Sequence, residues 1–340
     1  MEKKAIITAN NLSIGYRSGK KETIVHKGLE FSLFRGELTS LLGANGIGKS
    51  TLLRTLSASQ AVIEGSLFID GKSIDQINEK EKSRTIGVVL TDKTQAGGLT
   101  VYELVALGRQ PHTGFFGRLH KKDHDIIKNA LYQVGIEHKE NSYTAELSDG
   151  ERQKVMIAKA LVQECPLIIL DEPTAFLDAV SRIEIMTLLH TLATEQNKAI
   201  LLSTHDIEQA LVLSDRLWLL SEENGLQCGV TEDIIINKSM DALFMHDNIK
   251  FDYDHGVYYP IVKGKRDISV KCSDSTLLHW TVNALNRNGF KCIIDNQNKE
   301  SYYSVYIKNK NDYYLEEREK QIKFNTFESL INYLSTANPE

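Results

Sequence analysis

The residues best suited to chemistry form a glycine-rich stretch at 43–51, here termed the cradle, which reads GANGIGKST. Glycines allow backbone N–H groups to converge on phosphate oxygens, and a helix starting at Lys49 would direct its positive end toward the same oxygens. We expect Lys49 to reach the β- and γ-phosphates of a nucleotide, and the hydroxyl of Ser50 to bind Mg²⁺. The pattern therefore predicts a site for a nucleoside triphosphate and its magnesium ion.

Residues 167–172, LIILDE, combine an apolar run with two carboxylates. A buried strand that delivers acids at its carboxyl end, beside a phosphate-binding loop, is where Mg²⁺ is held. We assign Asp171 to the magnesium shell and Glu172 to the orientation and deprotonation of the attacking water, a general-base role. Solvated acids end strands in many α/β proteins, but the continuation PTAFLD at 173–178 favours the catalytic interpretation.

Two further segments could contact the terminal phosphate. Residues 147–153, LSDGERQ, here termed the signature, open an amphipathic helix that Ser148 could cap. The free N–H groups at the start of that helix would meet a γ-phosphate. Residues 203–206, STHD, follow another apolar run, and His205 would contact the γ-phosphate and hold the attacking water. The alternatives are a capped surface helix and a structural histidine.

In their order and separation, these four segments resemble the ATP-binding cassette (ABC) family over residues 5–222, nearly two-thirds of the chain. The resemblance implies hydrolysis of ATP to ADP and phosphate, with ATP and Mg²⁺ as bound cofactors and with Glu172, His205 and Lys49 as catalytic residues. Tyr16 is at the position where the family stacks an aromatic ring on adenine. The implied nucleotide contacts are Tyr16, Gly43, Asn45, Gly46, Gly48, Lys49, Ser50, Thr51, Ser148, Gly150 and Asp178.

One position departs from the family pattern. A glutamine that binds Mg²⁺ and reports on the membrane partner is expected after the apolar run 86–90, but the aligned residue is Thr91. Either Thr91 or Asp92 substitutes for that glutamine, or the contact is weakened. Thr91 therefore joins Ser50 and Asp171 as a candidate magnesium ligand.

The resemblance also implies partners. In the family, the cradle of one subunit and the signature of another close over the same ATP, so we expect a head-to-tail dimer with a second copy of this chain. The segment 99–112, LTVYELVALGRQPH, is similar to one in ATPases of bacterial importers for iron-siderophores, haem and cobalamin. This similarity implies membrane permease subunits, a substrate-binding protein that contacts the permease, and a cytoplasmic location on the inner face of the cell membrane.

Two alternative functions stay open at this point: a soluble, non-transport ABC ATPase, and a regulatory ATP-binding module with a C-terminal sensing domain. A net charge of −5 gives no reason to expect a nucleic-acid partner, which would favour a concentrated basic face.

The longest apolar runs are far shorter than the roughly 20 residues of a membrane helix, so the pore of a transporter would belong to another polypeptide. Four scattered cysteines indicate reduced thiols. His120 and His124 lie four residues apart, but their charged neighbours favour a solvated helix start over a metal site.

Short apolar runs that alternate with helical segments predict an α/β fold, a P-loop NTPase core of the ABC ATPase type. In the first half of this core we expect strands and one polar turn, in the order strand 5–16, turn 17–22, strand 29–34 and strand 38–42. Helical periodicity at about 95–160 predicts a helical subdomain. We place the ATPase domain at residues 1–249 and a small α+β domain at 250–340.

The C-terminal domain has an unusual composition. The last 90 residues hold nine of the thirteen tyrosines and fourteen of the 26 aromatic residues, with twelve basic and twelve acidic side chains. The tyrosines could form a binding surface, or the core and cross-strand pairs of a small sheet, and their β-propensity favours the sheet. We expect three strands and two helices, at 268–272, 290–294, 303–307, 275–287 and 327–334.

Overall fold

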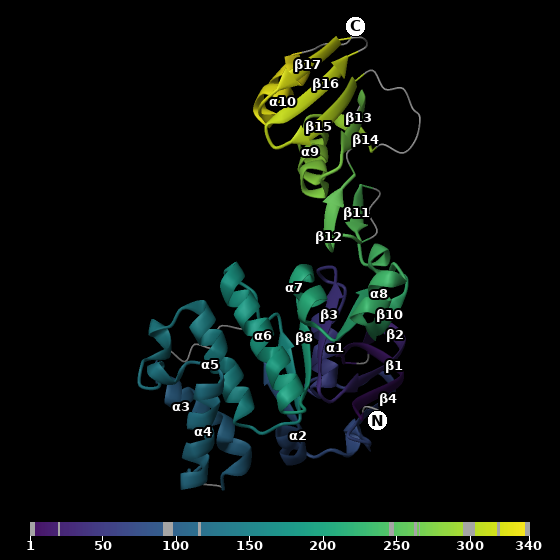
Figure 1. Cartoon of the computed structure of the whole chain (residues 1–340). Helices are drawn as coiled ribbons and strands as arrows, with labels where there is room; N and C mark the ends of the chain where they lie inside the picture. The colour runs from purple at the N-terminus through teal and green to yellow at the C-terminus, as the bar shows by residue number, and fades with distance from the viewer. Residues whose placement is uncertain are drawn as a thin grey trace. The chain divides into compact units, whose positions relative to one another are not determined.

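The computed structural model describes residues 4–19, 21–90, 98–114, 117–244, 248–261, 264, 266–294, 303–317 and 320–336 (Figure 1). The chain divides into two units. The first comprises residues 1–245 with 251–257, and the second comprises 246–250 with 258–340. The boundary that we placed between residues 249 and 250 lies within this interleaved stretch.

A six-stranded sheet forms the centre of the first unit, in the order β10-β9-β3-β8-β7-β6. Its strands are β3 (Glu37–Gly43), β6 (Ile86–Val89), β7 (Leu167–Asp171), β8 (Ala199–Ser203), β9 (Arg216–Ser221) and β10 (Gly225–Val230). All neighbours are parallel except β9 and β10. Every residue of β3 and β8 is buried, as expected for parallel strands covered on both faces. Because β3, β7 and β8 are parallel neighbours, their carboxyl ends meet at one edge of the sheet.

An antiparallel sheet, β2-β1-β4-β5, forms a second layer of the first unit. Its strands are β1 (Ala5–Ser18), β2 (Lys21–Phe34), β4 (Glu64–Ile69) and β5 (Lys72–Ser73). The polar turn predicted at 17–22 was wrong in extent, because β1 and β2 stay paired out to Ser18 and Lys21. Cross-strand pairing accommodates these polar residues, and Arg17 and Glu22 form an ion pair with 2.9 Å between Nε and Oε1.

Helix α1 (Lys49–Leu56) packs between these two layers. Its side chains Leu52, Leu53 and Leu56 belong to one hydrophobic core with residues of both sheets, including Leu12 of β1 and Leu41 of β3. This packing fixes the direction of the helix that begins at Lys49.

The helical subdomain comprises α3 (Val101–Ala106), the 3₁₀ segment η2 (Leu107–His112), α4 (Lys121–Gln133) and α5 (Asp149–Leu161). Helix α5 packs against the other three and against α6 (Ala179–Glu195). The hydrophobic core of this subdomain also includes buried residues of β7 and β8, so the subdomain is anchored on the central sheet.

Shorter elements complete the first unit: η1 (Ile74–Gln76), α2 (Glu79–Thr85), η3 (Glu137–Lys139), η4 (Thr144–Glu146), α7 (Ile207–Leu213), α8 (Thr231–Ile236) and η5 (Ser239–Ala242). The strands β11 (Ile249–Asp252) and β12 (Val257–Pro260) pair with each other in the interleaved stretch.

The second unit is a five-stranded sheet with helices α9 and α10, in the strand order β14-β13-β15-β16-β17. Its elements are β13 (Arg266–Cys272), α9 (Ser275–Arg287), β14 (Phe290–Ile294), β15 (Tyr303–Asn309), β16 (Asp312–Glu317), β17 (Lys320–Phe324) and α10 (Phe327–Thr336). The sequence interpretation missed β16 and β17. Tyr303 and Tyr313 are buried in the core, and Tyr306 pairs with Tyr314 across the strands, as the interpretation as a small sheet predicted.

Two searches of the described part of the chain bear on membranes and metals. None of its helices is long and apolar enough to cross a membrane. Among these same residues, no group of three or more His, Cys, Asp or Glu side chains could hold a metal ion. His120 precedes α4, where its backbone N–H donates to Oδ2 of Asp123 at 2.9 Å.

The two units have separate hydrophobic cores, which makes their stabilities separable. We predict that Leu315→Ala, at a fully buried position of β16, destabilises the second unit by about 2–5 kcal/mol. ATP affinity of the full chain should stay unchanged. Calorimetric unfolding, followed together with nucleotide binding, measures both quantities. If ATP binding were lost when the second unit unfolds, the stabilities of the two units would not be independent.

Candidate functional site

The cradle follows β3 directly and leads into α1. Gly46 and Gly48 have φ values of 78° and 111°, in the left-handed region that favours glycine. A Cβ at position 48 would lie 2.7 Å from Cγ1 of Val25, and one at Gly43 would lie 2.8 Å from the carbonyl oxygen of Leu220. These glycines therefore allow the loop to turn tightly and to approach its neighbours closely.

Lys49 is the first residue of α1 and is only 6% exposed. Its Nζ donates hydrogen bonds to the carbonyl oxygens of Gly43, at 2.8 Å, and Ala44, at 3.1 Å. Burial lowers the pKa of Lys49, and the charges of Glu172 and Asp171 act in the opposite direction. The ammonium group is thus held over the loop, within electrostatic range of both acids that the sequence singled out.

Ser203 links the two carboxylate-bearing residues. Its Oγ donates to Oδ1 of Asp171 at 2.7 Å and accepts the backbone N–H of Glu172 at 2.9 Å. Asp171 ends β7 and Ser203 ends β8, and the two residues are direct partners in the parallel register. Sequence reasoning gave Ser203 no role, because only the pairing of the strands brings its hydroxyl to this position.

Glu172 and His205, the two residues that the sequence predicts to act on the attacking water, lie in contact with each other. Nε2 of His205 lies 2.5 Å from Oε1 of Glu172, and both side chains remain partly exposed. Glu172 has a φ of 47°, uncommon for a residue with a Cβ. Strained backbone of this kind concentrates at functional sites. A water molecule that approaches from the exposed side would meet both side chains.

The remaining expected contacts in this region lie near the start of α1. Tyr16 is 46% exposed, and its hydroxyl lies 2.5 Å from Oγ1 of Thr51. Asn45 and Ser50 are exposed. An exposed ring anchored at its hydroxyl leaves its face free to stack on a planar ligand.

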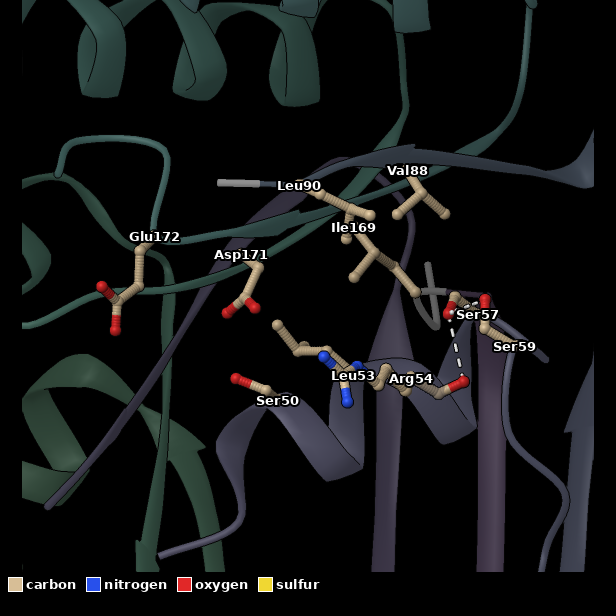
Figure 2. Close-up of a pocket in the computed structure, with 10 residues that line it drawn as sticks. All are labelled: Ser50, Leu53, Arg54, Ser57, Ser59, Val88, Leu90, Ile169, Asp171 and Glu172. Carbon is tan, nitrogen blue, oxygen red and sulfur yellow. Dashed lines mark hydrogen bonds between the residues drawn. The ribbon is translucent and has the colours of Figure 1, made fainter. Parts of the chain in front are cut away.

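A pocket of about 510 Å³ opens beside the carboxylates. In Figure 2 the carboxylate of Asp171 and the hydroxyl of Ser50 face the same space, with Glu172 at one end. Hard oxygen donors of this kind are the ligands that Mg²⁺ prefers, so Ser50 and Asp171 fit a magnesium ion. Thr91, the third candidate ligand, lies outside the described residues.

The signature does not join this cluster. Ser148 caps α5, accepting the N–H of Glu151 at 3.2 Å, and Glu151 accepts the N–H of Ser148 in return at 2.9 Å. Gly150 faces Ser181 of α6, which would lie 3.2 Å from an added Cβ. In Figure 1, α5 and α1 lie on opposite sides of α6 and β8. Ser148 is exposed and Gly150 is partly buried, and neither belongs to the cluster around the cradle of its own chain.

Asp178 also serves as a helix cap in this structure. Its Oδ1 accepts the backbone N–H of Ser181 at 2.9 Å at the start of α6, and its Oδ2 accepts the Ser181 hydroxyl at 3.0 Å. Asp178 follows the β7 acids along the chain. Its assignment as a nucleotide contact stays a prediction.

Comparison with known proteins agrees with these motifs. A model of the ABC transporter family matches residues 26–175, and a model of the iron ABC transporter C-terminal domain matches residues 265–335. The ferric enterobactin transport ATP-binding protein FepC of Escherichia coli is 35% identical over 243 residues, 72% of this chain and 88% of that protein. The iron(3+)-hydroxamate import ATP-binding protein FhuC of Bacillus subtilis is 34% identical over 71% of this chain and 88% of its own length.

Solved structures show the same relationship. A putative metal-chelate type ABC transporter in an inward-facing conformation aligns with a TM-score of 0.63 at 27% identity, over 76% of this chain and 99% of that one. A dimeric ABC transporter cassette aligns with a TM-score of 0.58 at 27% identity, over 66% of this chain and 98% of that one.

The bridging hydroxyl of Ser203 can be tested directly. We predict that Ser203→Ala lowers the rate of ATP turnover by about 10- to 150-fold, because a hydrogen bond to a charged group contributes about 1.5–3 kcal/mol. ATP affinity measured without magnesium should change little. The matched control is Ser40→Ala, which removes a buried hydroxyl of the same sheet that bonds Ser214 at 2.6 Å. Equal losses of turnover in the two variants would contradict the role of Ser203.

Proposed function

The chain belongs to the ABC transporter family of ATP-binding proteins, and on this basis we propose that it hydrolyses ATP to drive import of an iron chelate, haem or cobalamin through a separate permease. Members of the family bind ATP. The observation that carries the hydrolytic part of the proposal is the contact between Glu172 and His205 beside the cradle.

Each side chain at the site has a distinct role in this proposal. The cradle amides and Lys49 bind the β- and γ-phosphates, and they stabilise the charge that develops as the terminal phosphoryl group leaves. Glu172 accepts a proton from the attacking water, while His205 orients that water toward the γ-phosphorus. Ser203 keeps Asp171 and the backbone of Glu172 in register. Mg²⁺, held by Ser50 and Asp171, would neutralise charge on the phosphate oxygens.

A second copy of the chain completes each site in this proposal. The cradle of one protomer and the N-terminus of α5 of the other would bind opposite sides of one ATP, and twofold symmetry would create two such sites. The dimeric cassette among the structural relatives supports this arrangement. Because ATP contributes contacts to both protomers, its binding would close the dimer and its hydrolysis would reopen it.

The permease would dock beside the pocket and over residues 100–120. The pocket has an apolar wall at the end of the edge strand β6, formed by Val88, which is 37% exposed, and by Leu90 just after the strand, which is 50% exposed. Arg54, Ser57 and Ser59 also border the pocket (Figure 2). Apolar area with a few polar groups suits an inserted segment of another protein. This contact would hold the chain at the cytoplasmic, inner face of the cell membrane.

The substrate class is inferred from the relatives and from the second unit. FepC and FhuC are named for ferric enterobactin and iron(3+)-hydroxamate, and the second unit matches an iron-transporter domain. A substrate-binding protein would deliver the chelate to the permease from the opposite side of the membrane.

The alternative functions have weaker support. A regulatory module that does not turn over ATP would not require the Glu172–His205 pair. A soluble ABC protein that acts on nucleic acid would favour a basic surface, whereas the chain has a net charge of −5.

Glu172→Gln tests the proposal. The amide keeps the size of the side chain but cannot accept the proton, so ATP turnover should fall by about 10²- to 10⁴-fold while ATP binding persists. Cells whose only copy carries this variant should fail to take up labelled ferric hydroxamate or ferric enterobactin. Glu195→Gln, at an exposed position late in α6, should behave as wild type. Normal ATP turnover by Glu172→Gln would overturn the assignment of Glu172 as the general base. Normal uptake of the iron chelate in cells lacking the chain would overturn its proposed role in import.

A further inference from the structure

The segment 107–113 is packed unusually closely onto the C-terminal end of α5. A Cβ at Gly108 would lie 2.2 Å from the carbonyl oxygen of Lys159, so only glycine permits this approach. Nε2 of His112 lies 2.8 Å from the carbonyl oxygen of Gln163, just beyond the helix. On the same segment, Leu107 and Gln110 are exposed. The segment thus has one face bound to α5 and another available to a partner.

Arg109 forms the strongest part of this attachment. Its side chain is almost fully buried, and its Nη1 donates to the carbonyl oxygen of Val162 at 2.6 Å and to Oε2 of Glu164 at 2.7 Å. Its Nε and Nη2 both lie 2.9 Å from Oδ1 of Asp123, at the start of α4. One guanidinium therefore joins the 107–113 segment, the beginning of α4 and the end of α5.

Glu164 adopts a backbone conformation that its residue type does not favour. Its φ is 57°, in the left-handed region, where a residue with a Cβ is strained and glycine is not. Its carboxylate is partly exposed, with 48% of the side chain accessible. Glycine would relieve this backbone strain, and an ion pair with an exposed partner adds little stability by itself. We therefore attribute the carboxylate of Glu164 to its bond with Arg109, which fixes the 107–113 segment to the end of α5, and not to a gain in the stability of the fold.

The attached helix carries the signature at its other end. Helix α5 has 13 residues, which corresponds to a length of about 20 Å at 1.5 Å per residue. Its N-terminus is capped by Ser148 and contains Gly150. Helix α5 packs against α3, α4, η2 and α6, and a helix held by several neighbours moves as a rigid element, so displacement of one end is transmitted to the other.

We propose that Arg109, clamped by Glu164 and Asp123, is the positioning residue that couples a permease bound at segment 107–113 to the signature at the N-terminus of α5. This inference rests on the proposed function. Movement of the docked segment would shift α5 as a unit and bring Ser148 and Gly150 toward, or away from, the ATP held by the partner subunit. The isolated chain needs no such signal, so its own ATP turnover does not depend on the clamp.

The test uses the full chain with its permease in proteoliposomes. In Glu164→Gln, Arg109 keeps Asp123 and the Val162 carbonyl but loses its charged partner on the α5 side. We expect the melting temperature to stay within about 2 °C of wild type, as for other partly exposed surface positions. Turnover by the isolated chain should stay within about twofold, while the stimulation of turnover by the permease falls by about two- to thirtyfold. Glu164→Asp, which retains a carboxylate, should restore part of the stimulation.

Glu184→Gln is the matched control. It removes another partly exposed carboxylate that binds α5, through Lys154 at 2.9 Å, but it lies on the α6 side of the helix. It should retain full stimulation. Equal stimulation of wild type and Glu164→Gln would overturn the coupling role. A parallel loss of stability and of both activities would also overturn it, by showing a purely structural clamp. Absence of stimulation in the wild-type complex would instead overturn the proposed function, and the inference with it.

Discussion

The parallel pairing of β3, β8 and β7 is the constraint on which the rest of the site depends. These three strands end at one edge of the sheet, so the cradle, His205 and the two acids of the β7 end converge although they are widely separated in sequence. Two buried layers hold this edge in place: the core around α1 on one face, and the core shared with α5 and α6 on the other. The register of these strands therefore determines which residues can meet at the site.

The same architecture separates the cradle from the signature within one chain. Helix α5, with its capped N-terminus, is built into the subdomain on the far side of α6 and β8 from α1 (Figure 1). In the dimer that we propose, each protomer would supply half of a site, so ATP would form part of the contact between protomers and its binding would favour dimer closure. The clamp at Arg109 places the opposite end of α5 under the control of the segment that would meet the permease. One helix would thus connect the two interfaces.

Local sequence patterns predicted much of this structure. The strands of the core that flank the motifs, the helix that starts at Lys49 and the cap at Ser148 follow from short-range signals that the fold retains. What could not be predicted depends on pairing between distant residues. The hydroxyl of Ser203 acquires its partners only through the β7–β8 register, and Arg109 meets Glu164 only when η2 packs on α5. The polar ends of β1 and β2 resembled a turn because their cross-strand partners are invisible in sequence.

The central claim, that each ATP is bound between two protomers, can be measured with two copies fused into one tandem chain. One tandem carries Lys49→Ala and Ser148→Arg in the same copy, and the other carries them in different copies. Sites shared between protomers predict that the first tandem has no intact site and no ATP turnover, whereas the second keeps one intact site and measurable turnover. The reverse result, activity only in the first tandem, would contradict the account because it would place cradle and signature on the same protomer.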